Sequence, residues 1–147
     1  FSAPNVDAGG AEFMARIKDF TNSHDNSTFK ANLGGVAYFS LLRLVDIVVG
    51  NSSSGLTEAP SVGTPTVNIG DRQRGRIQGA SVISCCPTKT QISAAMEKAF
   101  SVKCSSAFYN PYGDGHSTDR IVSALKSYES FQGLLIKSFY EPDSVKE

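Results

Sequence analysis

The sequence has no excess of charge of either sign. Its 147 residues include fourteen basic and fourteen acidic side chains, so the formal net charge at neutral pH is zero. A nucleic-acid-binding domain generally needs a basic surface that neutralises phosphates. We therefore expect no nucleic-acid partner, and any anion site in this protein should be local.

Long apolar runs and paired cysteines are also missing. No window approaches the roughly 20 apolar residues that span a bilayer, and no segment resembles a secretory signal. The cysteines, Cys85, Cys86 and Cys104, are odd in number and lack zinc-type spacing, which favours reduced thiols over a disulfide framework. These absences predict a soluble, cytoplasmic protein with no membrane partner and no metal site.

The length and the overall composition of the sequence are ordinary for one globular domain. The sequence starts with Phe1 rather than Met, and the segment FSAPN stands where a short apolar stretch already ends. We therefore expect the chain to be a piece of a longer protein. Partners of any functional site would then belong to segments outside this sequence.

Apolar periodicity predicts alternating helices and strands. Helical spacing runs through residues 11–20, 35–44 and 88–100, and it returns in a last helix after residue 117. The predicted caps are Thr88 or Thr90 for the third helix and Ser117 or Thr118 for the last. The predicted inward residues of the first two helices are Phe13, Met14, Ile17, Phe20, Val36, Phe39 and Leu42.

The strands are predicted at residues 27–30, 45–49, 64–69 and 80–84. The largely β-branched segment 45–49 indicates a central strand that is covered on both faces. Strands that alternate with helices through short connections predict an α/β fold, in which a Rossmann-like parallel sheet is flanked by helices.

The polar loop GNSSSG, residues 50–55, directly follows the predicted strand at 45–49. In a parallel sheet such a loop lies at the carboxyl edge, where ligands bind, and it leads into a helix N-terminus that attracts anions. Serine hydroxyls add donors, and the flanking glycines, Gly50 and Gly55, permit a positive φ. The loop predicts a phosphate site, with simple helix capping by the serines as the alternative.

Spacing excludes three familiar motifs for this loop. Gly50 and Gly55 are separated as in a Walker A loop, but no lysine follows Gly55. Neither Ser52 nor Ser53 has a glycine two positions away on both sides, as a hydrolase nucleophile elbow requires. A Gly-x-Gly-x-x-Gly fingerprint is absent. A generic phosphate loop remains.

Charged residues follow the loop in the sequence. Glu58 is four residues after the nearest serine, one too many for a capping box, so it is free to bind ribose hydroxyls. The loop after the predicted strand at 64–69 carries Asp71 and three arginines. Arg72 is nearest the strand and is the best candidate to offset diphosphate charge, whereas Arg74 and Arg76 fit solvated surface charges equally well.

Several linked segments resemble one family. GNSSSGLTEAPSVGTPTVNIGDRQRGRIQGASVI, with APNVDAGG upstream and NPYGDG downstream, is similar to the C-terminal domain of the hydrolysing UDP-N-acetylglucosamine 2-epimerases. The resemblance covers most of the chain. It implies the C-terminal lobe of a glycosyltransferase-B-like two-lobe fold, truncated at its N-terminus. Residues 1–116 would be a UDP-binding Rossmann-like lobe without its opening strand and helix, and residues 117–147 a helix and tail that cross toward the missing N-terminal lobe.

The resemblance also implies a chemistry. Family members eliminate UDP from UDP-N-acetylglucosamine and add water to the resulting glycal, which gives N-acetylmannosamine without a metal or nicotinamide cofactor. The residues that the resemblance assigns to UDP are Ser52 and Ser53 at the diphosphate, Glu58 at the ribose, Arg72 at the nucleotide, and Asn5 and Leu33 near the uracil.

The resemblance assigns no catalytic residue to this chain, because the family's proton-transfer carboxylates and histidine belong to segments that the sequence does not contain. The two histidines present, His24 and His116, lie in polar turns and are predicted to be surface residues. The chain alone is expected to be inactive.

Two other functions remain open: the donor-binding lobe of a nucleotide-sugar glycosyltransferase, and a non-catalytic module that binds a nucleotide sugar. The sequence also leaves open which 2-acetamido sugar is bound, and whether the protein is a homo-oligomer.

Overall fold

The computed structural model describes residues 1–4, 9–103 and 108–140. The chain divides into two compact units, Phe1–Pro111 and Tyr112–Glu147. Asn5 and Cys104 lie outside the described residues. Within the described part, no helix is both long and apolar enough to cross a bilayer.

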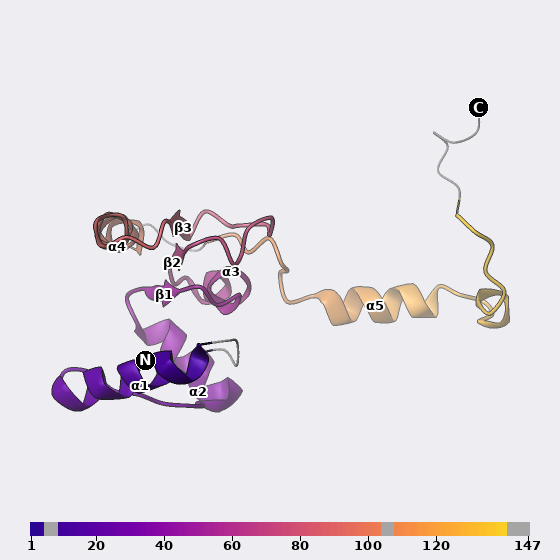
Figure 1. Ribbon diagram of the computed structural model, residues 1–147. Coiled ribbons are helices and arrows are strands. Elements are labelled where there is room, and N and C mark those ends of the chain that lie inside the picture. The colour runs from indigo at the N-terminus through magenta and orange to yellow at the C-terminus, as the bar shows by residue number, and fades with distance from the viewer. Residues whose placement is uncertain (5–8, 104–107, 141–147) are drawn as a thin grey trace. The chain divides into compact units, whose positions relative to one another are not determined.

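The first unit is built on a parallel sheet of three strands (Figure 1). Their order is β1 (Val48–Gly50), β2 (Thr66–Ile69) and β3 (Val82–Cys85). The register pairs Val49 with Val67 and Asn68 with Ser84. The predicted α/β fold with a parallel sheet and flanking helices is confirmed.

The two faces of the central strand β2 differ, because successive side chains point to opposite sides of a sheet. Val67 is fully buried and packs with Ala95 and Ala99 of helix α4 (Lys89–Lys103) in the main core cluster. On the other face, the Thr66 hydroxyl donates to the Gly55 carbonyl of helix α3 (Ser54–Thr57) at 2.9 Å. One face of β2 is therefore apolar, and the other uses hydrogen bonds.

One prediction about the sheet is wrong, since residues 45–49 do not form its central strand. β1 starts at Val48 and occupies an edge of the three-stranded sheet. The start of the segment instead completes helix α2 (Gly34–Leu44), because the Val45 N–H donates to the Leu41 carbonyl at 3.0 Å. Continuous burial belongs to β2, whose first three residues are buried.

The other strands are shorter than predicted. The segment 27–30 contributes a single parallel bridge between Ser2 and Lys30. The segments 64–69 and 80–84 supply β2 and β3, which begin two residues later than predicted. Of the two predicted caps for α4, Thr88 is confirmed, because its hydroxyl accepts the Gln91 N–H at 3.4 Å.

The first two helices bury less than their apolar spacing predicts. Helix α1 (Gly10–Ser23) buries Ile17, and α2 buries Leu42. The predicted inward residues Phe13, Phe20, Val36 and Phe39 are exposed, Val36 by 87%. Phe20 contacts the rings of Phe1 and His24, and Phe39 contacts that of Tyr38, yet both stay partly exposed. The amphipathic pattern therefore identified the helices but not how far their apolar faces are buried.

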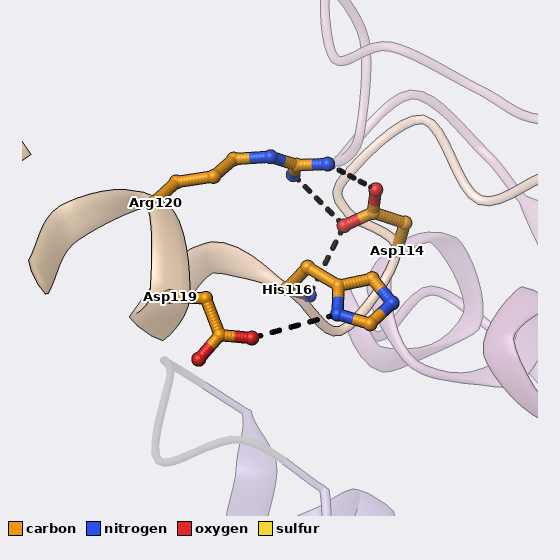
Figure 2. Close-up of polar contacts among 4 residues, drawn as sticks. All are labelled: Asp114, His116, Asp119 and Arg120. Carbon is orange, nitrogen blue, oxygen red and sulfur yellow. Dashed lines mark hydrogen bonds and ion pairs between the residues drawn. The ribbon is translucent and has the colours of Figure 1, made fainter. Parts of the chain in front are cut away.

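The second unit contains helix α5 (Ser117–Lys126) and a short 3-10 helix, η2 (Gln132–Leu134). Neither helix has a buried residue. The cap of α5 is His116, not Ser117 or Thr118 as predicted. The turn before α5 is instead organised by the carboxylate of Asp114, which accepts the His116 N–H (Figure 2).

The Asp114 carboxylate contacts both His116 and Arg120 (Figure 2). Its Oδ1 accepts hydrogen bonds from the His116 N–H at 3.1 Å and from Arg120 Nη1 at 2.9 Å, and Arg120 Nη2 contacts its Oδ2. These contacts, chiefly the hydrogen bond from Arg120, lower the pKa of Asp114 to about 2. Asp119 Oδ2 lies 3.7 Å from His116 Nδ1. The start of α5 is therefore held by exposed, charged groups.

Candidate functional site

The serine loop, residues 50–55, starts at the carboxyl end of β1 and turns into α3. Gly50 has a φ of +156°, a conformation that favours glycine. Helix α3 is only four residues long. The chain then changes to a 3-10 helix, η1 (Ala59–Val62), whose Pro60 has no N–H to continue the α-helical ladder. Because a macrodipole sums over many aligned peptides, one turn contributes little, and anion binding would rely on individual donors.

The donors of the serine loop are available. Neither the Ser52 N–H nor the Ser53 N–H donates a hydrogen bond within the part of the chain that the structure describes. Ser53 is the N-cap of α3 but makes no side-chain cap bond. The Ser52 hydroxyl accepts the Ser54 N–H at a long 3.4 Å. Helix capping therefore accounts for little of this run of serines.

Gly55 serves a different purpose from the one predicted. It lies inside α3 without a positive φ. A Cβ at this position would come within 2.4 Å of Thr66 Cγ2. Glycine is therefore required so that α3 can pack closely against β2, which holds the end of the serine loop against the sheet.

The loop after β2 reaches back to the serine loop, and its contacts include the predicted Arg72. Arg72 Nη1 donates to the Asn51 carbonyl at 3.3 Å, and Gln73 Nε2 donates to the same oxygen at 2.7 Å. The structure thus brings Arg72 to the serines. Arg74 and Arg76 are exposed, and within the described ranges neither side chain makes a hydrogen bond or an ion pair.

Glu58 follows directly after α3 and is half-buried. Its N–H donates to the Ser54 carbonyl at 2.9 Å. Among the described residues its carboxylate has no hydrogen-bond or ion-pair partner. The side chain therefore stays free to accept hydrogen bonds from a ligand.

A pocket of about 300 Å³ lies at the start of α2, where residues 30–35 line it together with Ser2 and Tyr38. Leu33, the residue predicted near the uracil, is the N-cap of α2 and a lining residue. The Tyr38 hydroxyl is hydrogen-bonded to the Ser54 hydroxyl. Tyr38 thus connects this pocket with the serine loop.

A larger pocket of about 670 Å³ lies beyond the carboxyl ends of β2 and β3. Its lining residues are mostly polar and include Asn68, Asp71, Arg74, Gln78, Ser84, Cys85, Cys86 and Gln91. Burial raises the pKa of the Cys85 thiol, and the charge of the neighbouring Cys86 raises it further. Among the described residues, no group of three His, Cys, Asp or Glu side chains could hold a metal ion.

Three contacts around the serine loop were missed by sequence reasoning, those of Tyr38, Gln73 and Asn110. Asn110 Nδ2 donates to the Thr57 carbonyl at 2.8 Å and to the Ser61 hydroxyl at 2.5 Å. All three link positions that are far apart in the chain. The only available signal was the NPYGDG segment that contains Asn110, and nothing in the sequence distinguished Gln73 from its exposed neighbours.

Both histidines are exposed, as predicted. The ring of His24 stacks on Phe20 with a centroid distance of 3.9 Å. His116 lies in the second unit, before α5. Asn5, predicted near the uracil, is outside the described residues.

Comparisons with known proteins show which proteins the chain is similar to. The sequence model of a family described as UDP-N-acetylglucosamine 2-epimerase matches residues 1–126. Polysialic acid biosynthesis protein P7 of Escherichia coli is 32% identical over 146 residues, which cover 96% of this chain and 37% of that protein.

Two further relatives are named as hydrolysing epimerases. The GDP/UDP-N,N'-diacetylbacillosamine 2-epimerase (hydrolyzing) of Campylobacter jejuni is 39% identical over 85 residues, 56% of this chain and 22% of that protein. The UDP-N,N'-diacetylbacillosamine 2-epimerase (hydrolyzing) of Legionella pneumophila is 31% identical over 134 residues, 91% of this chain and 35% of that protein. The chain thus spans little more than a third of the length of the curated relatives that it matches, and less for some.

Proposed function

Because the chain belongs to the UDP-N-acetylglucosamine 2-epimerase family, we propose that it forms the UDP-binding lobe of a hydrolysing 2-epimerase. The parent enzyme would eliminate UDP from UDP-N-acetylglucosamine and add water to give N-acetylmannosamine. The short coverage of the relatives supports a second lobe outside this sequence. That lobe would carry the proton-transfer groups, so the chain alone would bind UDP without turnover.

The observation that carries the proposal is that two unpaired backbone N–H groups and the side chain of Arg72 lie at the serine loop. The N–H groups of Ser52 and Ser53 have no acceptor within the described residues, and Arg72 reaches the same loop through the Asn51 carbonyl. Two N–H donors, two hydroxyls and a guanidinium suit a diphosphate, which offers several anionic oxygens.

The rest of the nucleotide would extend along two neighbouring features. The free carboxylate of Glu58 suits the ribose hydroxyls, since a carboxylate accepts hydrogen bonds and offers none. The pocket at Leu33 suits the uracil, with Asn5 as a further contact, and Tyr38 joins this pocket to the serine loop.

These groups would also assist the reaction. Breaking the bond between the sugar C1 and the phosphate oxygen leaves negative charge on the departing diphosphate. Donors that are already oriented stabilise this charge more in the transition state than in the bound substrate. Ser52, Ser53 and Arg72 would thus hold the leaving group and take no part as nucleophiles.

Helix α5 has a separate role in the proposal. Its exposed apolar side chains are Ile121, Val122 and Leu125, and Tyr128 follows the helix. We propose that residues 117–147 of the parent cross toward the first lobe, which would cover these side chains. An apolar face of this kind is normally buried by a partner surface.

The test combines binding and turnover. Calorimetric titration of the chain with UDP should give saturable binding, weakened in Ser52→Ala and Arg72→Ala and unchanged in the control Arg76→Ala. The parent enzyme should release UDP from UDP-N-acetylglucosamine in water alone. UDP release that requires an acceptor sugar would point to a glycosyltransferase, and absence of UDP binding by the chain would overturn the proposal.

A further inference from the structure

Gln73 is a buried side chain in a loop of exposed ones. It is 2% exposed, while Arg72 and Arg74 on either side are exposed. Two turn hydrogen bonds, from the Arg74 N–H to the Asp71 carbonyl at 2.8 Å and from the Arg76 N–H to the Gln73 carbonyl at 3.2 Å, shape this loop. The turn directs one neutral amide inward, and its Nε2 reaches the Asn51 carbonyl at 2.7 Å.

The contact matters because of the geometry of the peptide that follows Asn51. In a planar trans peptide, the C=O and the N–H point in opposite directions. Holding the Asn51 carbonyl toward Gln73 therefore points the Ser52 N–H away from Gln73. That N–H is one of the free donors of the serine loop.

We infer that Gln73 is a positioning residue, which fixes the Asn51–Ser52 peptide so that the Ser52 N–H faces the diphosphate of UDP. The inference rests on the proposed function and adds to it a residue that does not touch the ligand. A donor that is already oriented needs no rearrangement when the charge on the leaving group develops.

Arg72 cannot fill this role alone. It donates to the same carbonyl, but it is exposed and its distance of 3.3 Å is the longer one. In the proposed function the Arg72 guanidinium turns to the ligand. Of the two side-chain hydrogen bonds to the Asn51 carbonyl, the one from Gln73 then remains. A neutral amide is also the better buried anchor, because burying an unpaired cation is far more costly.

The other end of the amide makes no comparable contact. Gln73 Oε1 is buried and has no hydrogen-bond partner among the described residues. A buried acceptor without a donor destabilises the fold, and an apolar side chain of similar shape would avoid that cost. The hydrogen bond from Nε2 to the Asn51 carbonyl is therefore the contact of this amide that an apolar residue would lose.

The test is the substitution Gln73→Met in the chain, which removes both the donor and the unpaired acceptor at similar size. We expect a nearly unchanged Tm, UDP binding weakened about tenfold, as the loss of one oriented hydrogen bond implies, and unchanged binding of uridine, which has no phosphate. In amide NMR spectra, the shift of the Ser52 signal on adding UDP should shrink. Gln78→Met is the matched control, because Gln78 accepts from Ser84 and is exposed.

The outcomes separate the two proposals. Suppose that the unsubstituted chain binds UDP. If Gln73→Met then binds UDP and uridine as tightly as the unsubstituted chain, or binds both equally more weakly with a lower Tm, Gln73 has no positioning role and the proposed function stands. If the unsubstituted chain does not bind UDP, the proposed function itself fails.

Discussion

The serine loop and the start of helix α5 both depend on polar side chains, yet they use them differently. Around the serine loop, neutral side chains from distant parts of the chain donate to backbone carbonyls: Thr66 to Gly55, Gln73 to Asn51 and Asn110 to Thr57. At α5, Asp114 and Arg120 pair in solvent, six residues apart. Neutral, partly buried bonds fix the geometry of a site, whereas exposed ion pairs are worth little at ordinary salt.

The largest expected effect is on the site that the neutral bonds support. In the parent enzyme, Arg72→Ala should lower turnover and weaken UDP binding together, with a loss of about 3 kcal/mol in the transition state, as for other removed donors at a developing anion. Steady-state kinetics with UDP-N-acetylglucosamine would measure it. Arg76→Ala, which removes an exposed arginine four residues away, should leave both unchanged. Equal effects of the two variants would mean that Arg72 contributes only general positive charge.

The packing beneath the serine loop should give the next largest effect. In Gly55→Ala the new Cβ would lie within 2.4 Å of Thr66 Cγ2, so the free energy of unfolding should fall by about 2 kcal/mol through overpacking. Urea denaturation of the chain would measure this change. Gly133→Ala, where no atom lies within 4 Å of the added Cβ, should be neutral. An unchanged midpoint in Gly55→Ala would show that α3 is not held against β2.

A smaller effect is expected from the link between the NPYGDG segment and α3. Asn110→Ala removes the donor to the Thr57 carbonyl and the Ser61 hydroxyl, which should cost about 1 kcal/mol of stability. Thermal unfolding would detect the loss. Asn22→Ala is the control, because Asn22 is exposed on α1. A stability equal to that of the control would show that this link is dispensable.

The smallest effect concerns the exposed pair at α5. Arg120, through its hydrogen bond, lowers the pKa of Asp114 from its ordinary 3.8 to about 2. Because the pKa is depressed in the folded chain, the pair stabilises the turn above pH 3.8 and loses this contribution as the pH falls through about 2. Carboxyl NMR titration should find the low midpoint, and Arg120→Gln should move it back toward 3.8. Identical midpoints would contradict the pairing in Figure 2.

Sequence reasoning located those features that depend on local pattern. The helical spacing in residues 88–100 identified α4, and Thr88 caps it. The run of small polar residues after residues 45–49 located the serine loop. Local pattern could not tell that Val45 ends a helix while Val48 starts a strand, because both are β-branched and apolar.

Contacts between distant residues were out of reach of such patterns. Gln73 and Asn51 are 22 positions apart, and Asn110 and Thr57 are 53 apart. The fold alone brings each pair together. The same limit explains why the role of Gly55 was mispredicted. The sequence indicated a glycine needed for a turn, whereas the structure needs a residue without a Cβ so that α3 can pack against Thr66. Tertiary packing therefore decides which polar residues near the serines support the site.

The most direct test of the central claim is an amide NMR titration of the chain with UDP. We predict saturable shifts of the Ser52 and Ser53 signals, together with the Arg72 side chain, while signals of Gln78 and Gln91 in the larger pocket stay in place. No saturable shift at millimolar UDP, or shifts confined to that larger pocket, would contradict the assignment of the serine loop as the diphosphate site.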